Sequence, residues 1–445
     1  MPVSPARAAA FDILLRVDQQ DAYASELLHS SRCDELSSAD HGLATELVMG
    51  VLRWRSWLDK QIAEKSSQPL KKLDAEVLTA LRLAAYQLGL LERVPPRAAV
   101  YESVELVKRA RKRSAVPLVN AVLRKLADEA GKRGGAPLIA RAETAEELSE
   151  RSAHPLWLVE RWMREFGEDA ARRVCLYDQQ VPETAVRLQS AAVADELRED
   201  GITLAEGKLL TLARRVLSGD LSKTRAFREG RVAIQDEASQ LVALLVGQGR
   251  KILDCCAAPG GKTRVLAQRN PRAQILAVEL HPHRARLLRR LVPEQNVQIV
   301  PGDVRELPAD ASFDRVLVDV PCSGTGTLAR NPEIKWRLRI EDLADLQVRQ
   351  ASILQSAMRQ VAPRGRLVYS TCSLEREENL DVVEKALDLD SSFHAVDCRI
   401  ELERLRGEGE LAWKDPSSLG TELFLRTVPG VHPFEGFFAV VLEKD

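Results

Sequence analysis

The chain has 445 residues, of which 45% are hydrophobic and 29% are charged. These fractions match those of ordinary globular proteins, so they exclude a wholly disordered chain, a collagen-like repeat and a disulfide-stapled miniprotein. Lys and Arg number 64 against 65 Asp and Glu, and with a formal net charge of -1 any polyanionic partner must be held by local basic patches.

Chain length and cysteine usage indicate a multidomain protein of the reducing cytoplasm. A domain holds roughly 150 residues, which predicts two or three domains. The 7 cysteines form no C-x-x-C pair, and their odd number argues against a secreted disulfide framework. The first residues lack the apolar core of a signal peptide, and no later stretch has the length and apolarity of a membrane span. We therefore expect a cytoplasmic protein with no metal site and no membrane partner.

Residues 1–135 predict an all-helical domain, because apolar residues such as Leu47 and Val51 recur at helical spacing. The segment from Asp74 to Leu88 begins with an N-cap residue and carries its apolar side chains on one face, which predicts a core helix. From Tyr101 to Leu126 the pattern predicts a helix, a break at Pro117 and a second helix.

This last segment carries the densest basic cluster of the chain. Lys and Arg favour exposed helix faces, so the cluster is either a solvated surface or an RNA contact. The candidate RNA-binding residues are Lys108, Arg109, Arg111, Lys112 and Arg113.

A linker and a small mixed module are predicted next. Residues 131–137 are rich in Gly, Ala and Lys and lack apolar side chains that could pack, so they predict a linker. Between residues 145 and 230 a helix at Leu156–Phe166 precedes short apolar runs at Thr184–Leu188 and Leu209–Val216. This pattern predicts a small α+β module.

Residues 231–445 predict an α/β domain with a doubly wound parallel sheet. Short β-rich runs alternate with helical segments. The runs are Lys251–Cys255, Ala273–Leu280, Val297–Val300, Arg315–Val320 and Arg366–Ser370. Ligands bind such sheets beyond the carboxyl ends of the strands, so the residues after each run are the candidate site.

The first run leads into a glycine-containing binding loop at the start of a helix. Gly261 to Thr263 match the end of a Walker A phosphate loop. That loop, however, needs a glycine where Cys256 stands, and Pro259 stiffens a segment that must wrap phosphates. The residues therefore disfavour a nucleoside triphosphatase and favour a nucleoside ligand, with Glu279 placed to accept ribose hydroxyls and Asp303 to accept from an adenine amino group.

Two cysteines and a carboxylate follow the last two runs. Asp319 and Cys322 come after one run and Cys372 after the next, which places both thiols at one sheet edge. Most buried cysteines only pack, and we expect this of Cys33, Cys175, Cys255 and Cys398. The position of Cys322 and Cys372 beside Pro, Gly and Asp indicates a chemical role instead.

Taken in order, these motifs closely resemble the S-adenosylmethionine-dependent RNA cytosine-C5 methyltransferases. The resemblance rests on CAAPGGKT at Cys256–Thr263, DVPCSGTG at Asp319–Gly326, NPEIKW at Asn331–Trp336 and TCSLEREEN at Thr371–Asn379. The helical region, with LATELVMGVLRWR at 43–55, is similar to the NusB-type RNA-binding domain that precedes the catalytic domain in the bacterial 16S ribosomal RNA methyltransferase B (Sun) family.

The resemblance implies a Rossmann-like methyltransferase domain and a specific set of site residues. The implied cofactor-binding residues are Cys256, Ala257, Ala258, Pro259, Gly260, Gly261, Lys262, Glu279, Asp303 and Asp319. Many family members have Asp where this chain has Glu279. Either carboxylate can accept two hydroxyls, but the longer side chain changes the geometry.

The implied chemistry uses both thiols and Asp319. Cytosine C5 is a poor nucleophile, so a thiolate first adds at C6 and C5 then attacks the sulfonium methyl. In the RNA enzymes the nucleophile corresponds to Cys372, Cys322 assists product release, and Asp319 holds or protonates N3. In the DNA enzymes the nucleophile is instead a Pro-Cys cysteine like Cys322, and the spacing of the two residues does not separate these assignments.

The implied substrate is RNA, and the family favours 16S ribosomal RNA. Two alternatives remain open at this stage. One is a transfer RNA cytosine-C5 methyltransferase. The other is a NusB-like RNA-binding or ribosome assembly factor whose methyltransferase fold is inactive.

Overall fold

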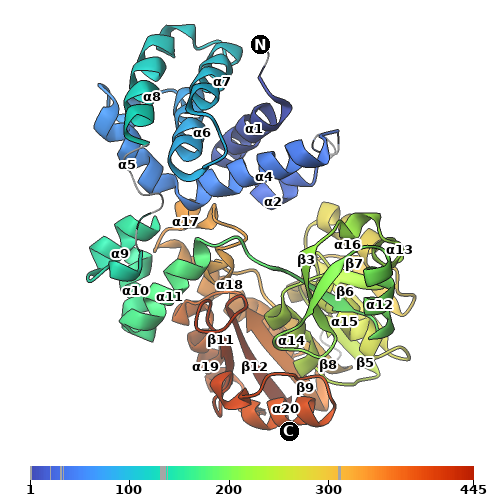
Figure 1. Cartoon of the computed structure of the whole chain (residues 1–445). Coiled ribbons are helices and arrows are strands. Elements are labelled where there is room, and N and C mark those ends of the chain that lie inside the picture. The colour runs from blue at the N-terminus through green and yellow to red at the C-terminus, as the bar shows by residue number, and fades with distance from the viewer. Residues whose placement is uncertain are drawn as a thin grey trace. The chain divides into compact units, whose positions relative to one another are not determined.

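The computed structural model describes residues 3–20, 22–30, 33, 35–130, 137, 139–308 and 312–445. The chain divides into two compact units, which we describe separately. The first unit, here called the helical unit, comprises Met1–Val181 and Leu328–Leu338, and the second, the sheet unit, comprises Pro182–Thr327 and Arg339–Asp445 (Figure 1). Of the predicted linker, residues 131–136 lie outside the described residues.

The helical unit contains α-helices and short 3-10 turns throughout its described residues, as the apolar periodicity predicts. The helices are α1 (Pro5–Gln20), α2 (Ala24–Leu28), α4 (Ser38–Arg53), α5 (Arg55–Lys65), α6 (Ala75–Leu90), α7 (Pro96–Arg109), α8 (Val116–Ala130), α9 (Ala145–Ser152), α10 (Leu156–Phe166), α11 (Glu168–Asp178) and α17 (Ile334–Arg337). Helix α6 lies at the centre and packs against α1, α4, α5, α7 and α8. Its apolar face makes it the predicted core helix, with Asp74 as its N-cap residue.

The predicted break at Pro117 is wrong in position. Helix α7 ends at Arg109 and α8 begins at Val116, so the break falls at residues 110–115. Pro117 lies in the first turn of α8, where a missing N–H costs no hydrogen bond and the fixed φ of proline suits a helix.

A segment remote in sequence completes the helical unit. Lys335 is almost wholly buried, and its Nζ donates to the carbonyl oxygens of Arg53 and Ala153 at 2.9 and 3.0 Å. The Trp336 Nε1 donates to the carbonyl oxygen of Leu52 at 2.7 Å. The Asn331–Trp336 motif is therefore built into the helical unit rather than into the sheet.

In the sheet unit, a small antiparallel sheet comes first in the chain. Its strands are β1 (Thr184–Leu188), β2 (Thr203–Glu206), β3 (Ala213–Ser218) and β4 (Val232–Ile234), in the order β2-β3-β1-β4, accompanied by α12 (Ala192–Glu199) and α13 (Arg225–Arg228). The apolar run at Thr184–Leu188 forms β1, and only the last part of the run at Leu209–Val216 is a strand, since β3 begins at Ala213. Helix α10, predicted within the same module, belongs to the helical unit. The domain limits at 135 and 230 stay predictions, since the compact units divide at Val181.

The main sheet has a parallel core, as predicted, and antiparallel strands that were not predicted. Its strands are β5 (Lys251–Asp254), β6 (Gln274–Glu279), β7 (Val297–Pro301), β8 (Phe313–Asp319), β9 (Val361–Thr371), β10 (Phe393–Ala395), β11 (Leu425–Thr427) and β12 (Phe437–Lys444). The order is β10-β12-β9-β8-β5-β6-β7, and β11 pairs with β12. Strands β5 to β9 pair in parallel, whereas β10, β11 and β12 are antiparallel to their neighbours.

Helices cover both faces of this sheet. The helices are α14 (Glu237–Leu245), α15 (Gly261–Arg269), α16 (Pro282–Leu291), α18 (Asp342–Met358), α19 (Leu380–Leu389) and α20 (Cys398–Gly407). Alternate residues of β9 point to opposite faces: Val368 joins the apolar cluster of α14, α15 and α20, and Leu367 joins that of α18 and α19. Over the described residues, no helix combines the length and the apolarity needed to cross a membrane.

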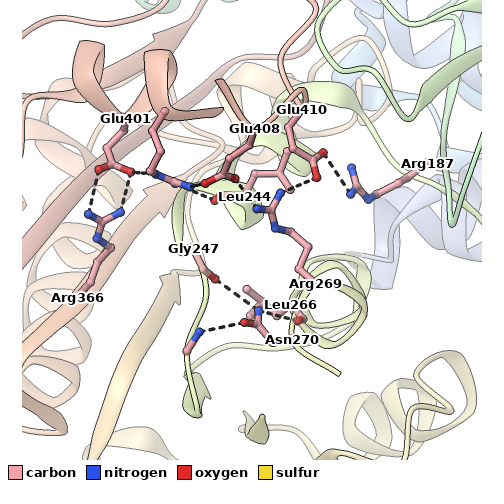
Figure 2. Close-up of polar contacts among 12 residues, drawn as sticks. Arg187, Leu244, Gly247, Leu266, Arg269, Asn270, Arg366, Glu401, Glu408 and Glu410 are labelled. Atoms are coloured by element: carbon pink, nitrogen blue, oxygen red, sulfur yellow. Dashed lines mark hydrogen bonds and ion pairs between the residues drawn. The ribbon is translucent and has the colours of Figure 1, made fainter. Parts of the chain in front are cut away.

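A chain of ion pairs joins the small sheet to the main sheet within the sheet unit (Figure 2). Arg187 of β1 is buried and lies 3.7 Å from the Glu410 carboxylate, which also pairs with Arg269 of α15 at 2.6 Å. The chain continues through Glu408 and Arg404 to Glu401, which Arg366 of β9 binds with two hydrogen bonds. Such pairs fix the position of the small sheet against the main sheet, because a buried charge that loses its partner destabilises the folded state.

We predict that Glu410→Ala destabilises the protein by about 3 to 5 kcal/mol, because Arg187 would remain buried without its counter-ion. Chemical denaturation of the full chain measures this change. The matched control is Glu403→Ala on α20, an exposed partner of Arg406, which should change the free energy of unfolding by less than about 0.5 kcal/mol. Equal effects of the two substitutions would contradict the role given to the buried pair.

Candidate active site

The strand order brings the predicted site residues to one edge of the main sheet. Strand β5 pairs with β6 on one side and with β8 on the other, so the chain order reverses between β5 and β8. In open α/β sheets this switch point, at the carboxyl ends of the strands, is where ligands bind. Asp254, Glu279 and Asp319 end β5, β6 and β8, and Asp303 follows β7.

The loop between β5 and α15 is closed by a buried carboxylate. Asp254 accepts a 2.7 Å hydrogen bond from the hydroxyl of Thr263 in the first turn of α15. Burial raises the pKa of Asp254 to about 7, although the Thr263 hydroxyl opposes this shift. Gly260 has a φ of +116°, and a Cβ there would lie 2.6 Å from Leu288 and Val292. Only glycine therefore lets the loop lie this close to α16.

Glu279 and Asp303 present carboxylates beside this loop. Glu279 is buried, and its two oxygens accept from the backbone N–H groups of Ala258 at 3.3 Å and His281 at 2.9 Å. Each oxygen retains a second lone pair. Asp303 pairs with Arg305, whose hydrogen bonds lower the pKa of Asp303 although partial burial opposes them. The structure thus brings both predicted acids to the sheet edge beside the loop.

Asp319 is held by an ion pair with the last predicted loop residue. The Lys262 Nζ lies 2.7 Å from Asp319 Oδ2, and the hydroxyl of Ser370 donates to Asp319 Oδ1 at 2.7 Å. The ammonium group also lies 4.9 Å from the centre of the Phe437 ring. Burial alone would lower the pKa of Lys262, but the charge and hydrogen bond of Asp319, with smaller electrostatic contributions from neighbouring groups, raise it. The cation therefore persists at this edge.

The two predicted thiols are in direct contact. Cys322 Sγ and Cys372 Sγ lie 3.2 Å apart, one after β8 and the other after β9. Both residues are partly exposed. The hydrogen bond to Cys372, together with burial, raises the pKa of Cys322 well above its ordinary range. Cys322 therefore keeps its proton.

The remaining cysteines do not take part in this contact. Cys33, Cys175, Cys255 and Cys398 are buried, in agreement with packing roles. Cys256 begins the binding loop, and burial followed by nearby carboxylates raises its pKa. It therefore stays a neutral thiol.

Much of the predicted basic cluster is compensated by acids within the helical unit. Lys108 pairs with Glu105, Arg109 with Asp12, and Lys112 with Asp74 and Glu76. Arg111 and Arg113 are exposed and have no ion-pair partner within the described part of the chain. Those two arginines are the members best able to attract a polyanion.

Sequence reasoning missed two buried carboxylates that organise the site. Asp254 ends the first predicted strand, but a single strand-end acid carries no specific signal. Glu378 lies in the TCSLEREEN motif and accepts hydrogen bonds from both cysteine loops. The cluster of acids after Cys372 was visible, but which of them turns inward depends on tertiary contacts.

Comparison with known proteins identifies the relatives of this chain. Residues 241–443 match the family described as 16S rRNA methyltransferase RsmB/F, and residues 4–128 match the NusB family. The probable ribosomal RNA small subunit methyltransferase B of Bacillus subtilis (strain 168) is 33% identical over 399 residues, which cover 86% of this chain and 88% of that protein.

Further relatives match almost end to end. The ribosomal RNA small subunit methyltransferase B of Vibrio cholerae is 30% identical over 454 residues, covering 99% of this chain and 97% of the relative. The crystal structure of PH0851 covers 100% of both chains with a TM-score of 0.78 and 25% identity. The chain belongs to the 16S rRNA methyltransferase RsmB/F family and is an S-adenosylmethionine-dependent RNA methyltransferase with an N-terminal NusB-family domain.

Proposed function

We propose that this protein methylates C5 of a cytosine in 16S ribosomal RNA through a covalent bond between Cys372 and C6 of the base. The observation that carries the proposal is the 3.2 Å contact of Cys322 and Cys372 beside the Asp319–Lys262 ion pair. The relatives named as ribosomal RNA small subunit methyltransferase B support the choice of 16S ribosomal RNA.

The residues at the sheet edge fit S-adenosylmethionine. When bound, this cofactor supplies an electrophilic methyl group on a sulfonium. Cys256 to Lys262 form a loop of small residues at the start of α15, and Glu279 has free lone pairs for ribose hydroxyls. Asp303 offers an acceptor for the adenine amino group. The carboxylates also suit a cationic ligand better than a triphosphate.

Cys372 performs the addition. Its thiolate bonds to C6, the electrons of the C5–C6 double bond move toward C5, and the negative charge spreads to N3 and the base carbonyl. Asp319, fixed in place by Lys262 and Ser370, holds the N3 edge of the base. The same lysine favours the thiolate electrostatically, since the Cys372 charge and the Lys262 charge attract each other.

Cys322 assists the elimination. In the free site a thiol on Cys322 can donate to the Cys372 sulfur, 3.2 Å away, which would stabilise an attacking thiolate. Once the Cys372 sulfur is bonded to C6, it no longer carries that charge, and one cause of the raised pKa of Cys322 disappears. Cys322 can then release its own proton to solvent and, as a thiolate, take the proton from methylated C5, which returns it to the thiol form. The C5–C6 double bond re-forms as the C6–S bond breaks, and Cys372 leaves as a thiolate.

We predict that Glu279→Ala weakens S-adenosylmethionine binding about 10- to 100-fold, because hydrogen bonds to a charged group contribute about 1.5 to 3 kcal/mol. Isothermal titration calorimetry measures the affinity. Exposed Glu306, in the turn after β7, provides the control Glu306→Ala, which should leave the affinity unchanged. Tight ATP binding with no affinity for S-adenosylmethionine would contradict the proposed ligand.

We predict that Arg111→Ala with Arg113→Ala weakens RNA binding and lowers its salt dependence by about 0.7 to 0.9 for each phosphate that the variant no longer neutralises. Binding of a ribosomal RNA fragment at several salt concentrations measures the slope. The control pair, Lys108→Ala with Arg109→Ala, removes charges already paired with acids and should have the smaller effect. RNA affinity that does not change in the first variant would identify the cluster as a solvated helix face.

We predict that alanine substitutions of the two thiols block different steps of the reaction. Cys372→Ala cannot form the C6 adduct, so both methylation and any covalent RNA complex should be lost. Cys322→Ala should still add and methylate but release product poorly, so a denaturant-resistant protein–RNA complex should accumulate. Gel electrophoresis with radiolabelled RNA separates these outcomes, with Cys398→Ala, a buried packing cysteine, as the control.

A complex trapped by Cys372→Ala and absent from Cys322→Ala would reverse the roles. The target base must leave its stack to expose C6, so single-stranded or flexible RNA should react fastest in all active variants.

A further inference from the structure

One buried carboxylate is bonded to both loops that carry the reactive thiols. Glu378 Oε1 accepts from the backbone N–H of Ser323 at 2.8 Å, directly after Cys322. Glu378 Oε2 accepts from the hydroxyl of Ser373 at 2.5 Å, directly after Cys372, and also from the hydroxyl of Ser323. The two hydroxyl oxygens lie 3.0 Å apart. A single side chain thus fixes the residue that follows each thiol.

A buried glutamine fixes the other side of Cys322. The Gln350 Nε2 on α18 donates to Glu378 Oε1 at 2.8 Å and to the carbonyl oxygen of Pro321 at 3.0 Å. Pro321 directly precedes Cys322. The backbone is therefore held on both sides of this thiol, by Gln350 before it and by Glu378 after it.

Asn379 holds the residues on both sides of Cys372. Its amide donates to the carbonyl oxygen of Ser373 at 2.9 Å and accepts from the hydroxyl of Thr371 at 2.5 Å. The two loops also bond directly, since the Gly326 N–H donates to the carbonyl oxygen of Cys372 at 2.9 Å. A Cβ at Gly326 would lie 2.8 Å from that oxygen, so the approach requires glycine.

Both carboxylate oxygens of Glu378 have all of their acceptor positions occupied by hydrogen bonds. We call Glu378, together with the groups that donate to it, the junction between the two cysteine loops. Glu378 is 0% exposed, and four donors reach its two oxygens. A buried carboxylate is stable as an anion only with such a set of donors. Its charge is one of the causes that raise the pKa of Cys322, after the Cys372 contact and burial.

We propose that Glu378 is a positioning residue that holds the two active-site thiols in contact and keeps the proton of the pair on Cys322. This inference rests on the proposed function for its catalytic consequence. Glu378 is wholly buried and acts through Ser323 and Ser373, and its negative charge disfavours a second negative charge on Cys322.

The first test separates geometry from charge by methyl-transfer kinetics. Glu378→Ala removes the junction and should lower kcat about 100-fold, since a displacement of about 1 Å in a reacting group has this effect. KM for RNA and affinity for S-adenosylmethionine should not change. Glu378→Gln keeps the shape and its hydroxyl partners can reorient, so it should retain at least tenfold more activity than Glu378→Ala. Wild-type kcat in Glu378→Ala would overturn the proposal.

The second test needs no RNA and therefore does not depend on the proposed reaction. Iodoacetamide alkylation of Cys322 is followed by mass spectrometry as a function of pH. The ionisable groups facing Cys322 are Cys372, Glu378 and Tyr369. In Glu378→Gln the pH of half-maximal Cys322 alkylation should shift downward, because one negative charge is gone. An unchanged midpoint would overturn the proposed proton bias.

Two further variants control for stability. Glu401→Gln alters another buried carboxylate of the sheet unit that binds Arg366 and Arg404, and it should leave the pH of half-maximal Cys322 alkylation unchanged.

If Glu378→Ala does not fold, Ser323→Ala removes one hydroxyl from the junction and should lower kcat while thermal unfolding stays near that of the wild type. Wild-type kcat in folded Ser323→Ala would count against the junction. A wild-type protein that makes no 5-methylcytosine refutes the proposed function but leaves the alkylation result valid.

Discussion

The parallel pairing of β8 with β9 is the constraint on which the candidate active site depends. Asp319 lies opposite Ser370 in this ladder, so the strands end at the same level and their following loops meet. Cys322 and Cys372 are 50 residues apart in sequence yet touch for this reason. A shift of one residue in the register would turn alternate side chains to the other face and separate Asp319 from the Ser370 hydroxyl. The hydrogen-bonded register of two strands therefore sets the distance between two sulfurs.

Charge is arranged around this edge so that each buried ion has a partner. Asp319 has Lys262 and Ser370, and Glu378 has four donors from its surroundings. Among the described side chains, only the Thr263 hydroxyl bonds to Asp254, and burial accordingly raises the pKa of Asp254 to about 7. At Asp254 the cost of burying the charged form outweighs the one hydroxyl donor, which is why its pKa rises.

Local sequence pattern was sufficient to predict the parallel core and the sheet edge at which the candidate site residues lie. Each of the five predicted runs is a strand, because an apolar run bounded by turn residues fits a buried parallel strand. Because ligands bind parallel sheets beyond the carboxyl ends of the strands, the same pattern placed Glu279, Asp319 and both thiols at one edge of the main sheet. The antiparallel β12 was missed, although Phe437–Lys444 is strongly β-forming, because pairing with β9 is a long-range choice that local pattern does not encode. The break near Pro117 was misplaced because a proline begins a helix as readily as it ends one.

What sequence could not supply is the set of contacts that joins distant segments. The Asn331–Trp336 motif was recognised with the catalytic motifs, yet Lys335 and Trp336 are bonded to Arg53, Ala153 and Leu52 in the helical unit. No periodicity indicates that a lysine is buried, since exposure is the rule for this residue and an exception needs carbonyl partners that only the fold provides. The same reasoning applies to Glu378. A motif names the residues present at a site, whereas the partners that satisfy each buried polar atom decide which of them bind, which react and which hold the others in place.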